Sequence, residues 1–352
     1  MKRSVLVSLF FIAVLLMLPT AALADGVPSF DFATPLFGLA VAPDGSLLVA
    51  DSGSGIVELR NGVGNLAVVL PGVVDIAPIG RGNMFALVSG SETSPAGKLF
   101  RVSRGEAREL ADLLAFEAAV NPDGGEIDSN PFDVAVLNGG KALVADAGGN
   151  DLLIVDQQGN VDWVATLPDE LVPTDNAKSL VGCPNAIPDL AFICGLPPMM
   201  PAQAVATSVA VGPDGAYYVG ELKGFPGPLG MSRVWRIEPG TLHAQCGSSP
   251  ACSVVAGGFT SIVDLAFGPN GALYVVEFDE ASFLAAELQV FYGIPGLMQG
   301  GTVNACDLSS GTCSVLAGGL PVPIAVAVDK NGAAYAAIAS LIPGAAQVIA
   351  LP

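Results

Sequence analysis

The sequence predicts an all-β fold, and more specifically a six-bladed β-propeller. Three observations support this prediction. The chain has 43 glycines and 27 prolines, while only 13% of its residues are charged, a composition rich in turns. Long stretches with the apolar period of an amphipathic helix are missing. Finally, a pair of apolar strands around a glycine turn recurs along the chain, and such a repeat fixes an architecture.

The repeat is a β-hairpin of about 14 residues. Glycine at its turn supplies the positive φ that tight hairpin turns require. Both strands are apolar at nearly every position, so both faces of the hairpin are expected to be covered. The clearest copy is "DLAFGPNGALYVVE", and the six copies span residues 38–51, 75–89, 133–146, 208–221, 264–277 and 325–338.

Each hairpin is followed by two weaker strands, as in "LLIVDQQGNVDWVATL" at 152–167. Four antiparallel strands per unit, covered on both faces, match the blades of a propeller. The largest insertion, at 168–203, is expected to be a surface excursion. The C-terminal "AQVIALP" supplies only a third strand for the last blade. We therefore predict that residues 26–34 add the missing outer strand and close the ring.

The first residues have the pattern of an export signal. Lys2 and Arg3 precede an apolar run at 5–18, and Ala22-Leu23-Ala24 offers a small-residue cleavage site. The run is shorter than the roughly 20 residues that a membrane helix needs, although an uncleaved anchor is the alternative. We predict a signal peptide at 1–24, a single propeller domain at 25–352 with no membrane span, and a periplasmic or extracellular location.

The formal net charge of −19 limits the possible partners. An acidic surface repels nucleic acid and anionic lipid, and favours cations, basic partners or solubility. We expect a small molecule or an envelope protein as partner, and no nucleic acid. A monomer is expected, because a closed propeller has protected edges.

The six cysteines form three couples that are close in sequence. In an exported chain such couples predict small disulfide loops. Zinc is the alternative, but the CxxC-type spacing of structural zinc sites is missing. The predicted bridges are Cys183–Cys194, Cys246–Cys252 and Cys306–Cys313.

Acidic residues recur at both ends of the hairpin repeat. The first strand of a blade starts at the same face at which the second strand ends, here called the mouth of the channel. Asp75, Asp133 and Asp264 start first strands, and Asp51, Asp146, Glu221 and Glu277 end second strands. The pattern predicts an acidic funnel, with Asp75, Asp146, Glu221 and Asp264 as ligand-binding residues. For Asp51 and Asp146, capping of the following turn is the simpler interpretation.

Acids gathered at one mouth raise one another's pKa unless a cation neutralises them, and calcium prefers oxygen ligands. The segment "GGEIDSNPFDVAV" at 124–136 has the highest density of such ligands, although a solvated polar loop is the alternative. The predicted metal residues are Glu126, Asp128, Asp133 and Glu277. Calcium is the one cofactor we consider.

The segments "IDSNPFDVAV", "LVADAGGNDLLIVD" and "GELKGFPGP" carry a family resemblance. Together with the hairpin repeat, they resemble the ScyD/ScyE family of exported, NHL-like bacterial propellers over residues 37–352. The resemblance implies a secreted six-bladed propeller. It brings no catalytic residues and no established substrate, and the association of some members with the pigment scytonemin does not carry over to this chain.

The broader gluconolactonase/regucalcin relatives place metal-binding polar residues just before the first strand's Gly-Leu-Ala. The corresponding positions here are almost all apolar, so this resemblance implies that their metal site is absent as such. The positions are Phe37, Val74, Phe132, Thr207, Val263 and Ile324.

The sequence favours a binding or scaffold protein of the cell envelope over an enzyme. A Ser-His-Asp hydrolase needs a histidine to carry the proton, and this chain has only His243, beside a predicted disulfide on the outer part of a blade. Quinone-dependent sugar dehydrogenases likewise need a histidine in the channel. The alternative is a calcium-assisted lactone or ester hydrolase of the gluconolactonase-like type, with a carboxylate as base.

Overall fold

The computed structural model describes residue 30 and residues 32–89 and 97–352. The predicted signal peptide at 1–24 lies outside the described residues. The first strands of six sheets pack against one another in a closed ring, which makes the molecule a six-bladed β-propeller, as predicted. A seventh, two-stranded sheet belongs to the insertion after the third blade.

The first two blades each have four antiparallel strands in chain order from the channel outwards. Blade 1 consists of β1 (Leu36–Val41), β2 (Leu47–Asp51), β3 (Gly55–Arg60) and β4 (Val63–Val69). Blade 2 consists of β5 (Val73–Gly80), β6 (Asn83–Val88), β7 (Lys98–Ser103) and β8 (Glu106–Asp112).

Blades 3 and 4 have the same order, with one addition. Blade 3 consists of β9 (Pro131–Leu137), β10 (Lys141–Asp146), β11 (Asp151–Val155) and β12 (Val161–Thr166). A short strand from the next blade, β18 (Ala244–Gln245), pairs in parallel with β12. Blade 4 consists of β15 (Ala206–Val211), β16 (Tyr217–Glu221), β17 (Ser232–Ile237) and β19 (Cys252–Phe259).

Blade 5 has four strands and blade 6 has three within the described chain. Blade 5 consists of β20 (Ile262–Phe267), β21 (Leu273–Glu277), β22 (Gly301–Asp307) and β23 (Thr312–Leu320). Blade 6 consists of β24 (Ala325–Val328), β25 (Ala334–Ile338) and β26 (Gln347–Ala350). The predicted hairpins are therefore the two inner strands of each blade, and the turn glycines Gly45 and Gly215 have φ values of 89° and 78°.

The ring closes by packing between blades 1 and 6. Strand β1 packs against β24, and Leu36 N donates a hydrogen bond to Ser340 O at 2.9 Å. Phe32 is buried in an apolar cluster that both blades form, and Val348 of blade 6 belongs to the same cluster. Of the predicted closing strand, residues 26–29 and 31 lie outside the described residues. Residues 30 and 32–34 do not form a strand, so this part of the prediction is wrong for them.

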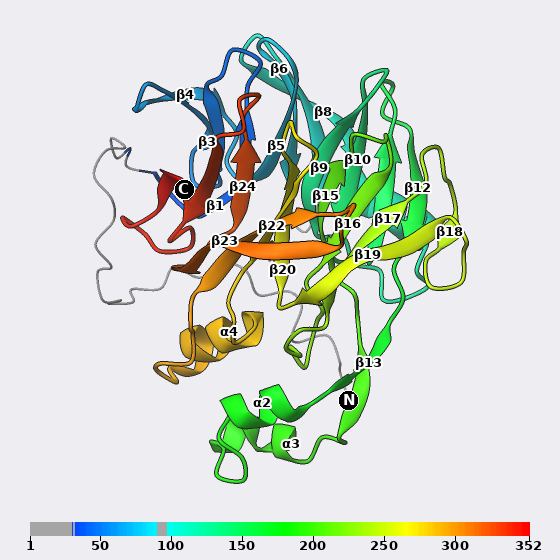
Figure 1. The fold of residues 1–352 in the computed structure, drawn as a ribbon. Coiled ribbons are helices and arrows are strands. Elements are labelled where there is room, and N and C mark those ends of the chain that lie inside the picture. Colours follow the sequence, from blue (N-terminus) through cyan, green and yellow to red (C-terminus); the bar gives the residue numbers. More distant parts are fainter. Residues whose placement is uncertain (1–29, 31, 90–96) are drawn as a thin grey trace.

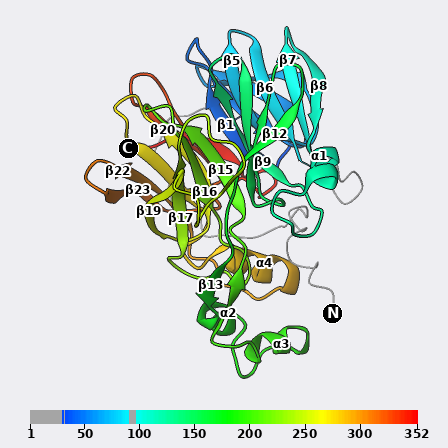
Figure 2. The same ribbon diagram turned by 90° about the vertical axis from the view of Figure 1, so that its right-hand side faces the viewer.

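The helices occur in the connections between strands. Helix α1 (Leu113–Val120) joins blades 2 and 3, and α4 (Phe283–Tyr292) follows β21. The insertion at 168–203 is a ribbon of β13 (Glu170–Pro173) and β14 (Met199–Ala202), with α2 (Asp175–Leu180), the 3-10 helix η1 (Pro188–Leu190) and α3 (Ala191–Cys194) at its tip. Figures 1 and 2 show α2, α3 and α4 beyond the same end of the propeller.

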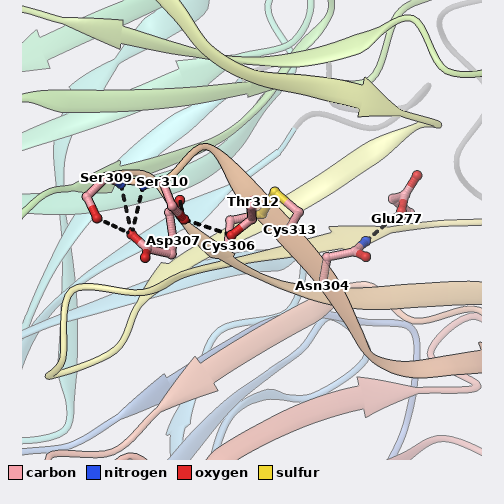
Figure 3. Close-up of a disulfide and its surroundings, with 8 residues drawn as sticks. All are labelled: Glu277, Asn304, Cys306, Asp307, Ser309, Ser310, Thr312 and Cys313. Atoms are coloured by element: carbon pink, nitrogen blue, oxygen red, sulfur yellow. Dashed lines mark hydrogen bonds between the residues drawn. A yellow bond between two sulfur atoms is a disulfide. The ribbon is translucent and has the colours of Figure 1, made fainter.

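All three predicted disulfides are present. Cys183–Cys194 links α3 to the loop after α2, and Cys246–Cys252 closes the loop between β18 and β19. Cys306–Cys313 joins the neighbouring strands β22 and β23 (Figure 3). Each bridge is local, so it fixes a loop or a strand pair without connecting distant blades.

The longest helix of the described chain, α4, has ten residues. Neither α4 nor any other described helix combines the length and apolarity needed to span a bilayer.

Candidate functional site

Three aspartates line the channel at one register position of the first strands. Asp75 faces Leu87, Asp133 faces Ala145 and Asp264 faces Val276 across their hairpins. The other three blades have Gly38, Ser208 and Ala325 at this position. The acids are therefore not a general feature of the repeat but belong to blades 2, 3 and 5.

Each channel aspartate binds the main chain of the following blade. The Oδ2 atoms of Asp75, Asp133 and Asp264 accept hydrogen bonds from Val134 N at 2.9 Å, Val209 N at 2.6 Å and Val326 N at 2.6 Å. Hydrogen bonds from a buried N–H to a carboxylate are among the stronger ones in proteins. These acids therefore tie blade 2 to blade 3, blade 3 to blade 4, and blade 5 to blade 6.

Burial raises the pKa of all three channel aspartates. The charge of Asp133 further raises the pKa of Asp75 and of Asp264, whereas a hydrogen bond from Asp75 counteracts the effect of burial on Asp133. Burial and the neighbouring carboxylate therefore both act to raise the pKa of Asp75. A Cβ on Gly38 would lie 2.2 Å from Asp75 Oδ1, so the glycine in blade 1 makes room for this side chain.

The acids at the ends of second strands also have structural partners. Asp51 accepts from Ala33 N at 2.7 Å, Asp146 from Asn130 N at 2.7 Å, and Glu277 from Thr260 N and from Asn304 Nδ2, the latter shown in Figure 3. Each of these main-chain donors lies in the segment that enters the same blade. The acids therefore fasten the entering chain to its own second strand.

The turn-capping interpretation of Asp51 and Asp146 agrees with the structure. Asp51 accepts from Gly53 N at 3.2 Å, and Asp146 accepts from Gly148 N at 3.0 Å and Gly149 N at 3.3 Å. With Ser129 Oγ at 2.6 Å, the Asp146 carboxylate has four donors. Its hydrogen-bonding capacity is used within the fold.

Glu221 belongs to a buried ion network. Its Oε1 lies 2.7 Å from Arg233 Nε and 3.1 Å from Lys223 Nζ, and Lys223 has a fully buried side chain. Glu170 at the start of β13 contacts Lys223 at 2.9 Å and Arg233 at 2.6 Å. Burial acts to raise the pKa of Glu170, but these two cations outweigh it and lower the pKa. The network is charge-balanced and anchors the ribbon to blade 4.

The mouth is covered by apolar side chains instead of forming an open acidic funnel. The six positions that precede this register position in the first strands are buried, and all except Thr207 belong to one apolar cluster. Phe283, Leu284 and Leu288 of α4 and Ile193 of α3 belong to the same cluster. Asn176 of α2 donates to Gly227 O at 2.6 Å and Ala281 O at 3.2 Å, which holds the insertion against the α4 connection. The predicted open funnel is wrong because these acids are buried: Asp75 and Asp133 are each 8% exposed, and Glu277 is 7% exposed.

The four residues predicted to bind metal lie in different places. Asp133 is in the channel, Glu277 is at the end of β21, and Glu126 and Asp128 are on the loop before β9, where Glu126 is exposed. Within the described residues, no three His, Cys, Asp or Glu side chains are close enough together to hold a metal ion. The structure therefore does not assemble a site from Glu126, Asp128, Asp133 and Glu277.

A cluster of buried acids that the sequence analysis missed lies beside that loop. Glu117 of α1 and Asp151 at the start of β11 are 3% and 1% exposed. Burial, followed by the charges of Asp123 and Asp146, raises the pKa of Glu117 to about 7. Burial, followed by the charges of Asp146 and Glu117, raises the pKa of Asp151 well above its usual value.

Two of the predicted residues border this cluster. Asp146 pairs with Asp151 across β10 and β11, and the charge of Asp128 contributes to the raised pKa of Glu117. The sequence did contain a signal for Asp151. Blade 1 has Gly55 opposite Asp51, whereas blade 3 places an acid directly opposite an acid, an arrangement that ordinarily destabilises a strand pair.

His243 lies on the outer edge of the propeller, as predicted. Its exposed ring has Nε2 2.7 Å from Asp162 Oδ1 and stacks against Trp163. Because Asp162 and Trp163 belong to β12, the outer strand of blade 3, the histidine is remote from the channel.

No protein-family model matches the chain, and no curated protein matches it. Solved structures do match, and they share the propeller fold of this chain. A gluconolactonase from Xanthomonas campestris aligns with a TM-score of 0.56 at 13% identity, covering 92% of this chain and 88% of its own.

Two further matches are named as sugar dehydrogenases. The PQQ-bound aldose sugar dehydrogenase from Streptomyces coelicolor has a TM-score of 0.54 at 12% identity, covering 92% of this chain and 95% of its own. A putative glucose dehydrogenase from Thermus thermophilus has a TM-score of 0.52 at 18% identity, covering 91% and 97%. Because the sequence identities to these structures are only 12–18%, the structural similarity shows that the fold is shared and shows nothing about activity.

Proposed function

We propose that this chain is an exported, ScyD/ScyE-like propeller that binds a small molecule or an envelope protein at its helix-covered mouth. The observation that carries the proposal is that all three channel aspartates use a carboxylate oxygen to accept a hydrogen bond from the next blade. Recognition is then left to the loops and helices over the mouth, and loops on a rigid scaffold are common binding sites.

The disulfides support the exported location. Three bridges within one chain are typical of oxidising compartments such as the periplasm or the extracellular space. The strongly acidic composition supports a partner other than nucleic acid.

Binding without turnover is supported by the place of the one histidine. His243 is exposed on the outer edge of blade 3, so no imidazole is available at the channel for proton transfer. The positions at which gluconolactonase-type propellers would hold a metal do not fit one here, because Phe37, Val74, Phe132, Val263 and Ile324 are apolar and packed.

A lactone or ester hydrolase is the second candidate, and the comparisons favour it over a scaffold. The matched structures named above are a gluconolactonase and two sugar dehydrogenases. Glu117 is the acid to test as a general base, because its pKa of about 7 lies near the pH at which such a base works.

A turnover panel separates the two candidates. Purified chain is incubated with lactones and esters, with and without divalent ions, and a small-molecule library is screened by thermal shift. We expect no turnover, and at least one ligand whose stabilising effect is weakened in Asn176→Ala but retained in the exposed control Asn185→Ala. Turnover that Glu117→Gln abolishes would replace the binding function with the hydrolase.

A further inference from the structure

Four buried oxygen atoms without a hydrogen-bond partner occur around α1 and the turn at 146–151. They are Glu117 Oε1, Asn121 Oδ1 and both carboxylate oxygens of Asp151. The described part of the chain contains seven buried side-chain atoms of this kind, and the other three are two hydroxyls and one arginine nitrogen elsewhere. Buried acceptors without a donor are costly, so four in one region require an explanation.

The local backbone brings these oxygens to one region. Glu117 lies in the last turn of α1, and Asn121 is the C-cap residue of that helix, whose N donates to Glu117 O at 2.9 Å. Asn121 Nδ2 donates to Gly125 O at 3.1 Å, so its amide nitrogen is used and its Oδ1 is not. The following loop reaches the turn, where Asn150 Nδ2 donates to Asp123 Oδ2 at 3.3 Å.

Asp151 of blade 3 contributes the other two unpaired oxygens. It starts β11 directly opposite Asp146, and its carboxyl group packs over Gly149, where a Cβ on the glycine would lie 3.4 Å from Asp151 Cγ. The N–H groups of Gly148 and Gly149 donate to Asp146, and Asn150 Nδ2 donates to Asp123, so no donor of the turn reaches the Asp151 carboxylate.

The region lacks a compensating positive charge. The charges of Asp123, Asp146 and Asp128 all act on Glu117, and none of these acids, nor Asp151, takes part in an ion pair among the described residues. The C-terminal end of α1 adds the partial negative charge of its free carbonyls. Oxygen acceptors, net negative charge and burial together are the properties of a cation site.

We propose that Glu117, Asn121 and Asp151 bind a hard cation, with calcium as the preferred ion, between the end of α1 and the 146–151 turn. Calcium takes six to eight oxygen ligands from carboxylates, amide and main-chain carbonyls and water, and accepts irregular geometry. The proposed ligand set has two carboxylates, and its third member is an amide. It is therefore compatible with the finding that no three acidic, histidine or cysteine side chains of the described chain converge. Magnesium, which needs a near-ideal octahedron, fits this set less well.

Thermal unfolding of the purified chain tests the site. In wild type, calcium at about 100 times its Kd should raise the Tm by about 3–6 °C over the value in chelator. Asp151→Asn and Glu117→Gln should weaken calcium binding at least tenfold. Glu126→Gln, an exposed acid on the neighbouring loop, is the matched control and should keep the full response.

A second readout separates loss of binding from loss of folding. In chelator, Asp151→Asn should melt no lower than wild type, because it removes an uncompensated buried charge. Calorimetry should give one calcium per chain for wild type and for Glu126→Gln. The proposal is overturned if wild type melts alike in calcium and chelator, or if both Asp151→Asn and Glu117→Gln retain the calcium response. Neither readout depends on ligand binding at the mouth.

Discussion

At the scale of single residues, similar acids have opposite environments. Asp146 and Asp151 face each other across β10 and β11, yet Asp146 accepts four hydrogen bonds and Asp151 accepts none. The repeat predicted Asp146 as a turn cap, because an aspartate before two glycines finds N–H donors in the turn. Only the folded structure shows that the Asp151 carboxylate has no hydrogen-bond donor.

Asp75→Asn should stabilise the protein at neutral and higher pH. Burial raises the pKa of Asp75, so the native state keeps a proton that the unfolded chain releases, and stability falls as the pH rises from the ordinary aspartate pKa towards the folded one. An asparagine side chain can still accept from Val134 N and donate to Asp133, and it carries no charge at any pH. In urea unfolding, the free energy of unfolding of Asp75→Asn should exceed that of wild type by about 1–2 kcal/mol at pH 8. It should also fall less than that of wild type between pH 5 and pH 8.

The exposed Asp189→Asn provides the control and should leave both values unchanged. If Asp75→Asn instead lowers stability at pH 8, the carboxylate form of Asp75 is the one that the channel requires.

At the scale of elements, the buried ion network fixes the ribbon that carries α2 and α3. Lys223→Met should destabilise the protein by about 3–5 kcal/mol, because it leaves Glu170 and Glu221 with too little positive charge in a buried setting. Urea unfolding measures the change, and the exposed Lys330→Met should be neutral. An effect of Lys223→Met as small as that of the control would mean that water compensates these carboxylates.

The disulfide at the tip of the ribbon should act locally. Replacing Cys183 and Cys194 by serine removes a bridge with a sequence separation of 11, which in chain-entropy terms is worth about 3 kcal/mol to the loop that it closes. Limited proteolysis should then cut within 175–195 while the propeller remains intact. Cleavage spread over all blades, or no new cleavage at all, would contradict a local role.

At the scale of the whole molecule, the fold could be predicted and the site could not. The hairpin repeat shows in the sequence because turn glycines such as Gly45 and Gly215 and paired apolar strands are local features. The cation region depends on Glu117 and Asp151, which are 34 residues apart on different elements and share no motif. The apolar cover of the mouth likewise combines α3 and α4, which are far apart in sequence.

The protein as a whole should be more stable in mild acid when cations are removed. Burial raises the pKa of Glu117 to about 7 and of Glu287 to about 8, and it raises that of Asp151 and Asp264 as well. Since the native state binds protons that the unfolded state has lost, stability should fall between pH 5 and pH 8 in chelator. Denaturant unfolding across this range measures the slope, and a rising stability would contradict the raised pKa values.

The central claim is that the acids around α1 need a bound cation at neutral pH, and one measurement tests it most directly. The melting temperature of the purified wild-type chain is measured at pH 7.5 in chelator and again after addition of excess calcium. We predict a rise of several degrees on adding calcium, and a return to the lower value when chelator is restored. An identical melting temperature in all three conditions would contradict the account.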